Sequence, residues 1–193
     1  MKKIDIFIIG SGGHASSCIE LIESTNKFNI LGIFTEDLIK YKDGYKVLGK
    51  TSEVIKLKKK CKNIVLGFGS IYDLKIRYKI FNSLLKKGFK FPIIISPSAN
   101  ISKFSKISYG VQIFHNCTVN ANAIISENCI INSHSLIEHD VFLDRNVHVS
   151  TGVIINGSVI IKKNTFIGSG SILRDNIKVE EGSFIKMGTI KKK

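Results

Sequence analysis

Large aliphatic residues recur at every sixth position through the second half of the chain. The series is unbroken and comprises Ile95, Ile101, Ile107, Ile113, Val119, Ile125, Ile131, Ile137, Leu143, Val149, Ile155, Ile161, Ile167, Leu173, Val179 and Ile185. Four residues after each of them a small or β-branched residue usually follows, as at Cys117, Ala123 and Val141. A period of six fits neither the period of 3.6 of an α-helix nor the period of 2 of a strand. It predicts a parallel β-helix, in which every hexad forms one short flat face and one turn.

The hexad register also predicts which way the side chains point. The large aliphatic points into the helix and stacks on its counterparts one coil above and below, and the small residue points inward near the corner. Three hexads, or about 18 residues, close one coil of a triangular prism. The sixteen hexads therefore predict a β-helix of about five coils, which we assign to residues 95–190.

The first half of the chain alternates apolar strand-like runs with helical patterns. Strands are predicted at residues 3–9, 30–34, 63–66 and 91–95, and helices from a glycine-rich turn to residue 26, at 51–60 and at 71–87. Such alternation predicts a small Rossmann-like α/β domain with a parallel sheet. We place this domain at residues 1–94, because Pro92 and Pro97 punctuate the junction with the repeats.

The glycine-rich turn Gly10-Ser11-Gly12-Gly13-His14-Ala15 follows the first predicted strand and opens a helix. It fits the pattern G-x-G-x-x-G/A, in which glycines let the backbone approach a phosphate that the helix N-terminus attracts. Glu36 and Asp37 follow the second strand, where acidic groups accept hydrogen bonds from a ribose or a base. We expect a nucleotide site here. A tight turn without a ligand is the alternative, and a redox dinucleotide is disfavoured because no second nucleotide-binding half follows.

His139 is the histidine of the repeats that the hexad register singles out. As the third residue of its hexad it should point outward near a corner, and Asp140 follows it directly. Gly157 lies one coil later and Ala121 one coil earlier, so the space around His139 should be open. A substrate or cofactor would need such space, whereas a lone histidine in a turn is more commonly a solvated residue.

Acyl transfer needs a group that takes the proton of the nucleophile near neutral pH, and the histidine pKa of about 6.5 suits that task. A neighbouring carboxylate can orient the ring and stabilise the imidazolium. We therefore expect His139 to act as a general base that Asp140 orients. His134 is expected to be a turn residue, whereas His148 occupies a position that other hexads fill with an apolar group. No CxxC or HExxH spacing accompanies these histidines, so we expect no metal site.

The net charge of +14 is compatible with binding to nucleic acid, an anionic membrane or anionic small molecules. The lysines are spread along the chain and no nucleic-acid motif is present, so we expect anionic small substrates such as nucleotides and coenzyme A rather than nucleic acid. No apolar stretch reaches the roughly 18 residues that would span a membrane, so membrane insertion is not expected. Four scattered cysteines and the lack of a secretory signal indicate reduced thiols and a cytoplasmic protein.

A nucleotide-binding α/β domain followed by a β-helix with the sequence LIEHD resembles a known family. This family is the hexapeptide-repeat acetyltransferases of the sialic acid O-acetyltransferase and nucleotide-sugar N-acetyltransferase group. The resemblance covers nearly the whole chain and is closest to the bacillosamine-pathway type, which acetylates a UDP-4-amino-sugar. It implies a left-handed β-helix, acetyl-CoA as co-substrate, and a homotrimer with active sites between neighbouring subunits.

The resemblance also implies roles for individual residues. The catalytic histidine and its acidic partner fall on His139 and Asp140, a nearby asparagine that contacts substrate on Asn132, and two groups that contact acetyl-CoA on His148 and the Gly157 backbone. The nucleotide side falls on Gly10, Gly12, Gly13 and His14 of the turn and on the acids Glu36 and Asp37. The chain departs from the family pattern in three places: Asp140 where glutamate is common, LGFGS after the third strand, and the lack of a GVPAK tail.

These observations predict an acetyl-CoA-dependent N-acetyltransferase that acts on a nucleotide-linked 4-amino-sugar in the biosynthesis of a glycan or a nonulosonic acid precursor. O-acetylation of sialic acid or another sugar is the alternative within the family. A non-catalytic β-helix that binds nucleotide sugars is a second class of function, and a basic protein that binds nucleic acid is a third. The sugar, its nucleotide and the pathway are not predicted.

Overall fold

The computed structural model describes residues 2–69, 71 and 73–192. The chain divides into two compact units, one comprising residues 1–69 and 79–92 and the other residues 70–78 and 93–193. Among the described residues, no helix is both long enough and apolar enough to cross a membrane.

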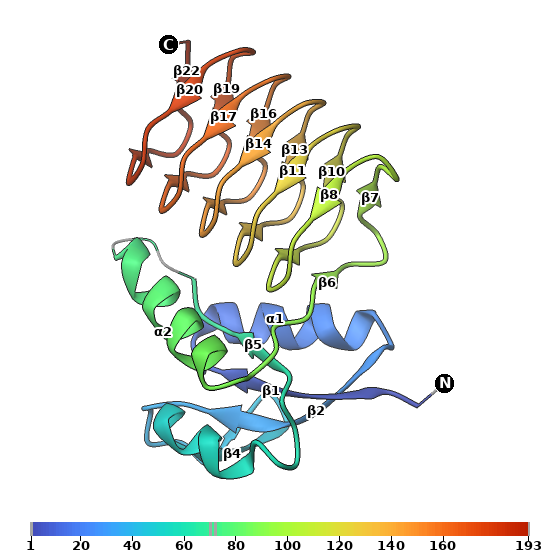
Figure 1. Ribbon diagram of the computed structural model, residues 1–193, viewed down its shortest axis with the longest axis vertical. Coiled ribbons are helices and arrows are strands. Elements are labelled where there is room, and N and C mark those ends of the chain that lie inside the picture. The colour runs from blue at the N-terminus through green and yellow to red at the C-terminus, as the bar shows by residue number, and fades with distance from the viewer. Residues whose placement is uncertain (1, 70, 72, 193) are drawn as a thin grey trace. The chain divides into compact units, whose positions relative to one another are not determined.

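The first unit is built on a sheet with the strand order β3-β4-β2-β1-β5 (Figure 1). Its strands are β1 (Ile4–Ile9), β2 (Phe28–Phe34), β3 (Tyr41–Lys42), β4 (Tyr45–Gly49) and β5 (Ile64–Leu66). The helices are α1 (Gly13–Ser24), the 3-10 helix η1 (Thr51–Leu57) and α2 (Leu74–Lys86), of which residues 74–78 group with the second unit. β4, β2, β1 and β5 run parallel, so their carboxyl ends lie at the same edge of the sheet.

The predicted parallel α/β domain is confirmed, but several of its elements differ from the prediction. The segment at 51–60 forms a 3-10 helix over Thr51–Leu57, and the strand predicted at 91–95 is limited to Ile94–Ile95. The helix predicted at 71–87 is observed from Leu74, and its residue 72 lies outside the described part of the chain. The β3–β4 hairpin was not predicted. Asp43 and Gly44 connect its strands with φ angles of 46° and 84°, and an Asp-Gly pair is a known signal for such a turn.

The second unit is the β-helix that the hexads predicted, and it is left-handed (Figure 1). Its strands lie in three parallel sheets with the orders β22-β19-β16-β13-β10-β7, β20-β17-β14-β11-β8 and β21-β18-β15-β12-β9-β6. Their bounds are β6 (Ile94–Ile95), β7 (Asn100–Ile101), β8 (Lys106–Ile107), β9 (Gln112–Ile113), β10 (Thr118–Val119), β11 (Ile124–Ile125), β12 (Ile130–Ile131), β13 (Leu136–Ile137), β14 (Phe142–Leu143), β15 (His148–Val149), β16 (Ile154–Ile155), β17 (Ile160–Ile161), β18 (Phe166–Ile167), β19 (Ile172–Leu173), β20 (Lys178–Val179), β21 (Phe184–Ile185) and β22 (Ile190–Lys191).

The core of the β-helix consists of the two inward positions of each hexad. Ile137 pairs with Val119 in the coil before it and with Ile155 in the coil after it, and all three side chains are at most 1% exposed. Val141 and Val153, four residues after their large aliphatics, are equally buried. Complete burial of one such side chain contributes about 1.5–3 kcal/mol, so the repeat of the pattern stabilises every coil in the same way.

The turns of the β-helix share one backbone feature at the fourth position of the hexad. This position has a positive φ in consecutive hexads, at Gly110, Asn116, Asn122, Asn128, His134, Asp140, Asn146, Gly152, Ser158, Asn164, Gly170, Asn176, Gly182 and Gly188. Glycine, asparagine and aspartate adopt the left-handed region more readily than other residues. Three of these asparagines also form a buried ladder, with Nδ2 of Asn128 donating to Oδ1 of Asn146 at 2.9 Å and Nδ2 of Asn146 donating to Oδ1 of Asn164 at 2.8 Å.

Candidate active site

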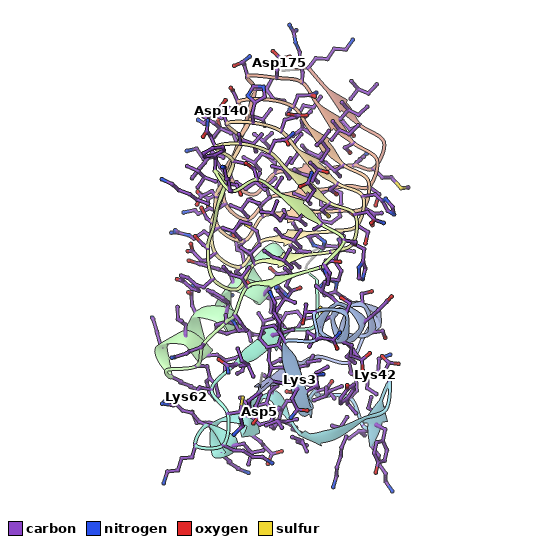
Figure 2. The ribbon with its side chains drawn as sticks, turned by 90° about the vertical axis from the view of Figure 1, so that its right-hand side faces the viewer. Lys3, Asp5, Lys42, Lys62, Asp140 and Asp175 are labelled. Carbon is purple, nitrogen blue, oxygen red and sulfur yellow. The ribbon has the colours of Figure 1, made fainter. Side chains whose placement is uncertain are left out.

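His139 and Asp140 form an ion-pairing contact at the corner that follows β13. Nδ1 of His139 lies 2.8 Å from Oδ2 of Asp140. The other carboxylate oxygen of Asp140 accepts a hydrogen bond of 3.1 Å from Nδ2 of Asn122, and the backbone N–H of Asp140 donates to the Ala121 carbonyl at 3.0 Å. Asp140, which is labelled in Figure 2, has φ 60°, a conformation that aspartate tolerates better than glutamate, and its shorter side chain still reaches the ring of His139.

The electrostatics of this pair suit a base. The hydrogen bond to Asp140 raises the pKa of His139 above its ordinary value, and the same bond lowers the pKa of Asp140. In neutral His139 the Nδ1–H donates to the carboxylate, which leaves the lone pair of Nε2 to accept a proton. The imidazole is 61% exposed, so a substrate can reach Nε2 without displacing protein groups.

Gly157 lies directly against the ring of His139. A Cβ at this position would lie 2.7 Å from Cε1 and 2.8 Å from Nε2 of the histidine. The next residue, Ser158, donates its backbone N–H to the His139 carbonyl at 3.0 Å, so both coils are held in register. Within the described residues the Gly157 N–H donates to no backbone or side-chain acceptor, which keeps it available for an oxyanion. The structure thus brings together three of the residues expected at the site.

Asn132 and His148 form a second pair in a different sheet of the β-helix. Nδ2 of Asn132 lies 2.9 Å from Nε2 of His148, so the amide donates to an unprotonated ring nitrogen. His148 is 7% exposed and contacts Phe166 edge to face, with ring centroids 5.1 Å apart. Asn132 follows β12 and His148 is in β15, whereas His139 follows β13 of the neighbouring sheet. A single chain therefore places the two pairs on separate corners.

The glycine-rich turn lies at the carboxyl end of β1, as expected. Gly10 has φ 107°, and a side chain there would crowd the Gly67 carbonyl at 3.1 Å, so both the conformation and the space require glycine. Gly12 is the N-cap of α1 and forms no side-chain cap, and Gly13 and the half-buried His14 begin the helix. Backbone N–H groups at a helix N-terminus bind phosphate.

A ring of hydrogen bonds links this turn to the end of β2. The hydroxyls of Ser11 and Thr35 lie 2.7 Å apart, Ser11 Oγ donates to Oδ2 of Asp37, and the backbone N–H of Asp37 donates to Thr35 Oγ1 at 3.2 Å. Because an ionised carboxylate can only accept, Thr35 must donate to Ser11, and every donor of the ring is used. The ring holds Asp37 in place and leaves its second carboxylate oxygen to accept a hydrogen bond from a ligand.

The two acids that follow β2 have different surroundings. Asp37 joins the glycine-rich turn through the ring, whereas Oε1 of Glu36 accepts the backbone N–H of Thr51 at 3.2 Å, at the start of η1. Both acids line a cavity of about 450 Å³, together with Lys40 and Lys50 among others. The structure therefore brings Asp37, but not Glu36, into contact with the turn.

Three residues that were not predicted support the expected site residues. Ser11 and Thr35 orient Asp37, and Asn122 orients Asp140. Asn122 could have been found, because it precedes Asp140 by 18 residues and so occupies the same place one coil earlier. Among the described residues no group of three or more His, Cys, Asp or Glu side chains is arranged to hold a metal ion, and all four cysteines are buried free thiols.

Comparisons with known proteins agree with this architecture. Residues 5–84 match the PglD N-terminal domain. Over 98% of this chain and 91% of the other, the structure is similar to the acetyltransferase domain of PglB from Neisseria gonorrhoeae FA1090 in complex with acetyl coenzyme A, with 26% identity and a TM-score of 0.92. The predicted resemblance to acetyltransferases of this group is therefore confirmed, together with the fold.

Two further solved structures share the fold at lower identity. A histidine mutant of perosamine N-acetyltransferase from Caulobacter crescentus, in complex with CoA and GDP-perosamine, matches with 21% identity and a TM-score of 0.79 over 94% of this chain and 93% of the other. WeeI from Acinetobacter baumannii AYE matches with 20% identity and a TM-score of 0.83 over 98% and 92%. No curated protein matches the sequence.

Proposed function

We propose that this protein transfers the acetyl group of acetyl-CoA to the 4-amine of a nucleotide-linked sugar. The observation that carries the proposal is the His139 ring, held by Asp140 on one side and packed against Gly157 on the other. The structural match at 26% identity, an acetyltransferase domain in complex with acetyl coenzyme A, supports acetyl-CoA as the co-substrate. The preference for an amine over a hydroxyl rests on the motif resemblance, and O-acetylation is the alternative.

In the proposed reaction, Nε2 of His139 takes the proton of the sugar amine as the nitrogen attacks the thioester carbonyl. Asp140 holds the ring through Nδ1–H and stabilises the imidazolium that forms. The Gly157 N–H stabilises the negative charge on the carbonyl oxygen of the tetrahedral intermediate. Collapse of the intermediate breaks the carbon–sulfur bond, and the thiolate of coenzyme A takes the proton from the His139 imidazolium, so the products are an amide and a thiol and His139 is neutral again.

The two units have separate tasks in this proposal. Residues 1–94 bind the nucleotide, with its phosphates at Gly10, Gly12, Gly13 and His14 and its ribose or base near Glu36 and Asp37. The β-helix of residues 95–190 binds acetyl-CoA and performs the transfer. Because the pair Asn132–His148 and the pair His139–Asp140 lie on different corners of one chain, a homotrimer that joins the corners of neighbouring subunits would complete the site.

The proposal is tested by thiol release from acetyl-CoA with a panel of UDP-, GDP- and CMP-linked sugars that carry amino or hydroxyl acceptors. We expect turnover with an amino sugar, and a loss of about 10²-fold or more in kcat for His139→Ala because a general base contributes that much. His134→Ala is the matched control, since His134 is a turn residue with φ 62°. Turnover confined to hydroxyl acceptors would favour O-acetylation. Nucleotide-sugar binding without acetyl-CoA binding would indicate a non-catalytic protein, and an unchanged kcat in His139→Ala would exclude the base.

A further inference from the structure

Lysines of the first unit gather at one edge of its sheet. Four chain segments, residues 2–5, 25–29, 58–63 and 86–90, meet where β1 and β5 begin. They contain ten lysines and a single acidic residue, Asp5. We call the ten residues the amino-edge lysines: Lys2, Lys3, Lys27, Lys58, Lys59, Lys60, Lys62, Lys86, Lys87 and Lys90.

Hydrogen bonds join the first three segments. The backbone N–H of Ile4 donates to the Lys27 carbonyl at 2.9 Å, which places the connection between α1 and β2 beside the start of β1. Nδ2 of Asn63 donates to the Asp5 carbonyl at 2.9 Å, which joins the start of β1 to the segment that leads into β5. Figure 2 shows Asp5 with its neighbour Lys3 and with Lys62 in this part of the unit.

The fourth segment, which follows α2, joins the same edge. The backbone N–H of Lys90 donates to the Lys62 carbonyl at 2.8 Å. Nζ of Lys58 lies close to Gly88, since a Cβ on that glycine would be 2.8 Å from it. The segments that carry the amino-edge lysines therefore adjoin at one edge of the folded unit, although they lie far apart in the sequence.

The charge of this surface is not neutralised by the protein. No amino-edge lysine forms an ion pair with another described residue, and all except the half-buried Lys58 are exposed. The side chain of Asp5 already accepts a hydrogen bond of 2.8 Å from Asn29. The positive charges of the amino-edge lysines repel one another, and an anionic partner that neutralises them would be attracted strongly.

The glycine-rich turn lies at the opposite edge of the sheet from the amino-edge lysines, although Lys87 lines a cavity that also includes Glu36. β1 runs from the amino-edge lysines at Ile4 to the glycine-rich turn at Gly10, and α1 begins beside that turn. In parallel α/β sheets the ligand lies at the carboxyl ends of the strands, whereas this surface lies at the amino ends. Phosphate binding at the turn therefore does not account for the lysines.

We propose that the amino-edge lysines attach the protein peripherally to the surface of an anionic phospholipid membrane. Clustered lysines bind such surfaces through charges that act within about 10 Å at 0.1 M salt. Proteins that bind single-stranded nucleic acid stack its bases on exposed aromatic side chains, whereas the aromatic residues of this edge, Phe28, Phe89 and Phe91, are at most 8% exposed. Ile4 is 51% exposed and offers an apolar side chain to the headgroup region. Binding through this edge leaves the nucleotide edge open to solution.

Sedimentation with vesicles of phosphatidylglycerol and of phosphatidylcholine, at about 50 and 300 mM salt, tests the proposal. Two quadruple variants have the same net charge and differ in where four exposed lysines are removed. The amino-edge variant carries Lys59→Gln, Lys60→Gln, Lys62→Gln and Lys90→Gln, and the matched control carries Lys103→Gln, Lys106→Gln, Lys186→Gln and Lys192→Gln. Circular dichroism and thiol release with soluble substrates verify that the amino-edge variant is folded and active.

We expect the wild-type protein to sediment with phosphatidylglycerol but not with phosphatidylcholine, and to be released at the higher salt concentration. The amino-edge variant should lose at least about 10-fold in vesicle partition, while the control should change by less than about 3-fold. An equal loss in both variants would show that net charge alone attracts the protein, and this would overturn the proposal. Failure of wild-type protein to bind anionic vesicles at low salt, or displacement from them by RNA at stoichiometric concentration, would overturn it as well.

Discussion

Replacing Gly157 with alanine tests whether the position of the His139 ring governs catalysis. The added methyl carbon would lie 2.7 Å from Cε1 and 2.8 Å from Nε2, whereas carbon atoms in ordinary contact are about 3.5–4.0 Å apart. The ring must therefore move by about 1 Å. Gly157 does not have a positive φ, and Ala121 occupies the equivalent place two coils earlier, so the backbone accepts alanine.

The displaced ring should reduce activity without unfolding the protein. Misplacement of a catalytic group by about 1 Å can cost about 10²-fold in rate, so we expect a loss of that order in kcat. The thermal midpoint should not change, because the exposed His139 ring can swing into solvent. Steady-state thiol release and thermal denaturation measure the two quantities.

The same substitution in a His139→Ala background provides the control. Without the imidazole, the methyl group of Gly157→Ala has no ring to displace, so the double variant should be no slower than His139→Ala alone. A wild-type kcat in Gly157→Ala, or an additional loss in the double variant, would refute the argument that the methyl acts through the ring.

Three further variants probe the neighbouring interactions. Asp140→Asn removes the main cause of the raised pKa of His139. The acidic limb of the pH profile of kcat/KM, which reports the loss of the histidine proton, should therefore shift to lower pH. If the limb does not shift, it reports the titration of another group. Ser11→Ala breaks the ring of hydrogen bonds that holds Asp37, so the KM of the nucleotide sugar should rise several-fold while kcat and the KM of acetyl-CoA stay unchanged. A fall in kcat alone would contradict a role of Ser11 in nucleotide binding. Asn146→Gly keeps the left-handed turn but deletes two buried hydrogen bonds, so chemical denaturation should show a loss of about 2–4 kcal/mol in the free energy of unfolding. The control Asn116→Gly, at an exposed turn, should lose less than about 1 kcal/mol, and equal losses in the two variants would exclude the asparagine ladder as the cause.

The β-helix was predictable in detail because its signal is local and repeats. Each hexad needs one large aliphatic inside and one residue that tolerates a left-handed turn, regardless of what lies elsewhere in the chain. The outward position of His139, and its place between Ala121 and Gly157, followed from counting 18 residues per coil. The α/β domain was predicted less accurately. Its short β3–β4 hairpin contributes little hydrophobic periodicity, and the Asp43-Gly44 turn was overlooked.

The sequence by itself determined the repeat, the residues that point inward, and the position of Gly157 next to His139. The reason is the fixed period: residues 18 positions apart always lie in the same place on neighbouring coils. Only the tertiary structure decided which polar groups meet. Asp37 reaches the glycine-rich turn and its neighbour Glu36 reaches η1, because the chain bends at these two residues after β2. Only the packing around the sheet sets which of them faces the turn. The same holds for Ser11, which bonds to residues 24 and 26 positions away through the pairing of β1 with β2, a distance that no local pattern encodes.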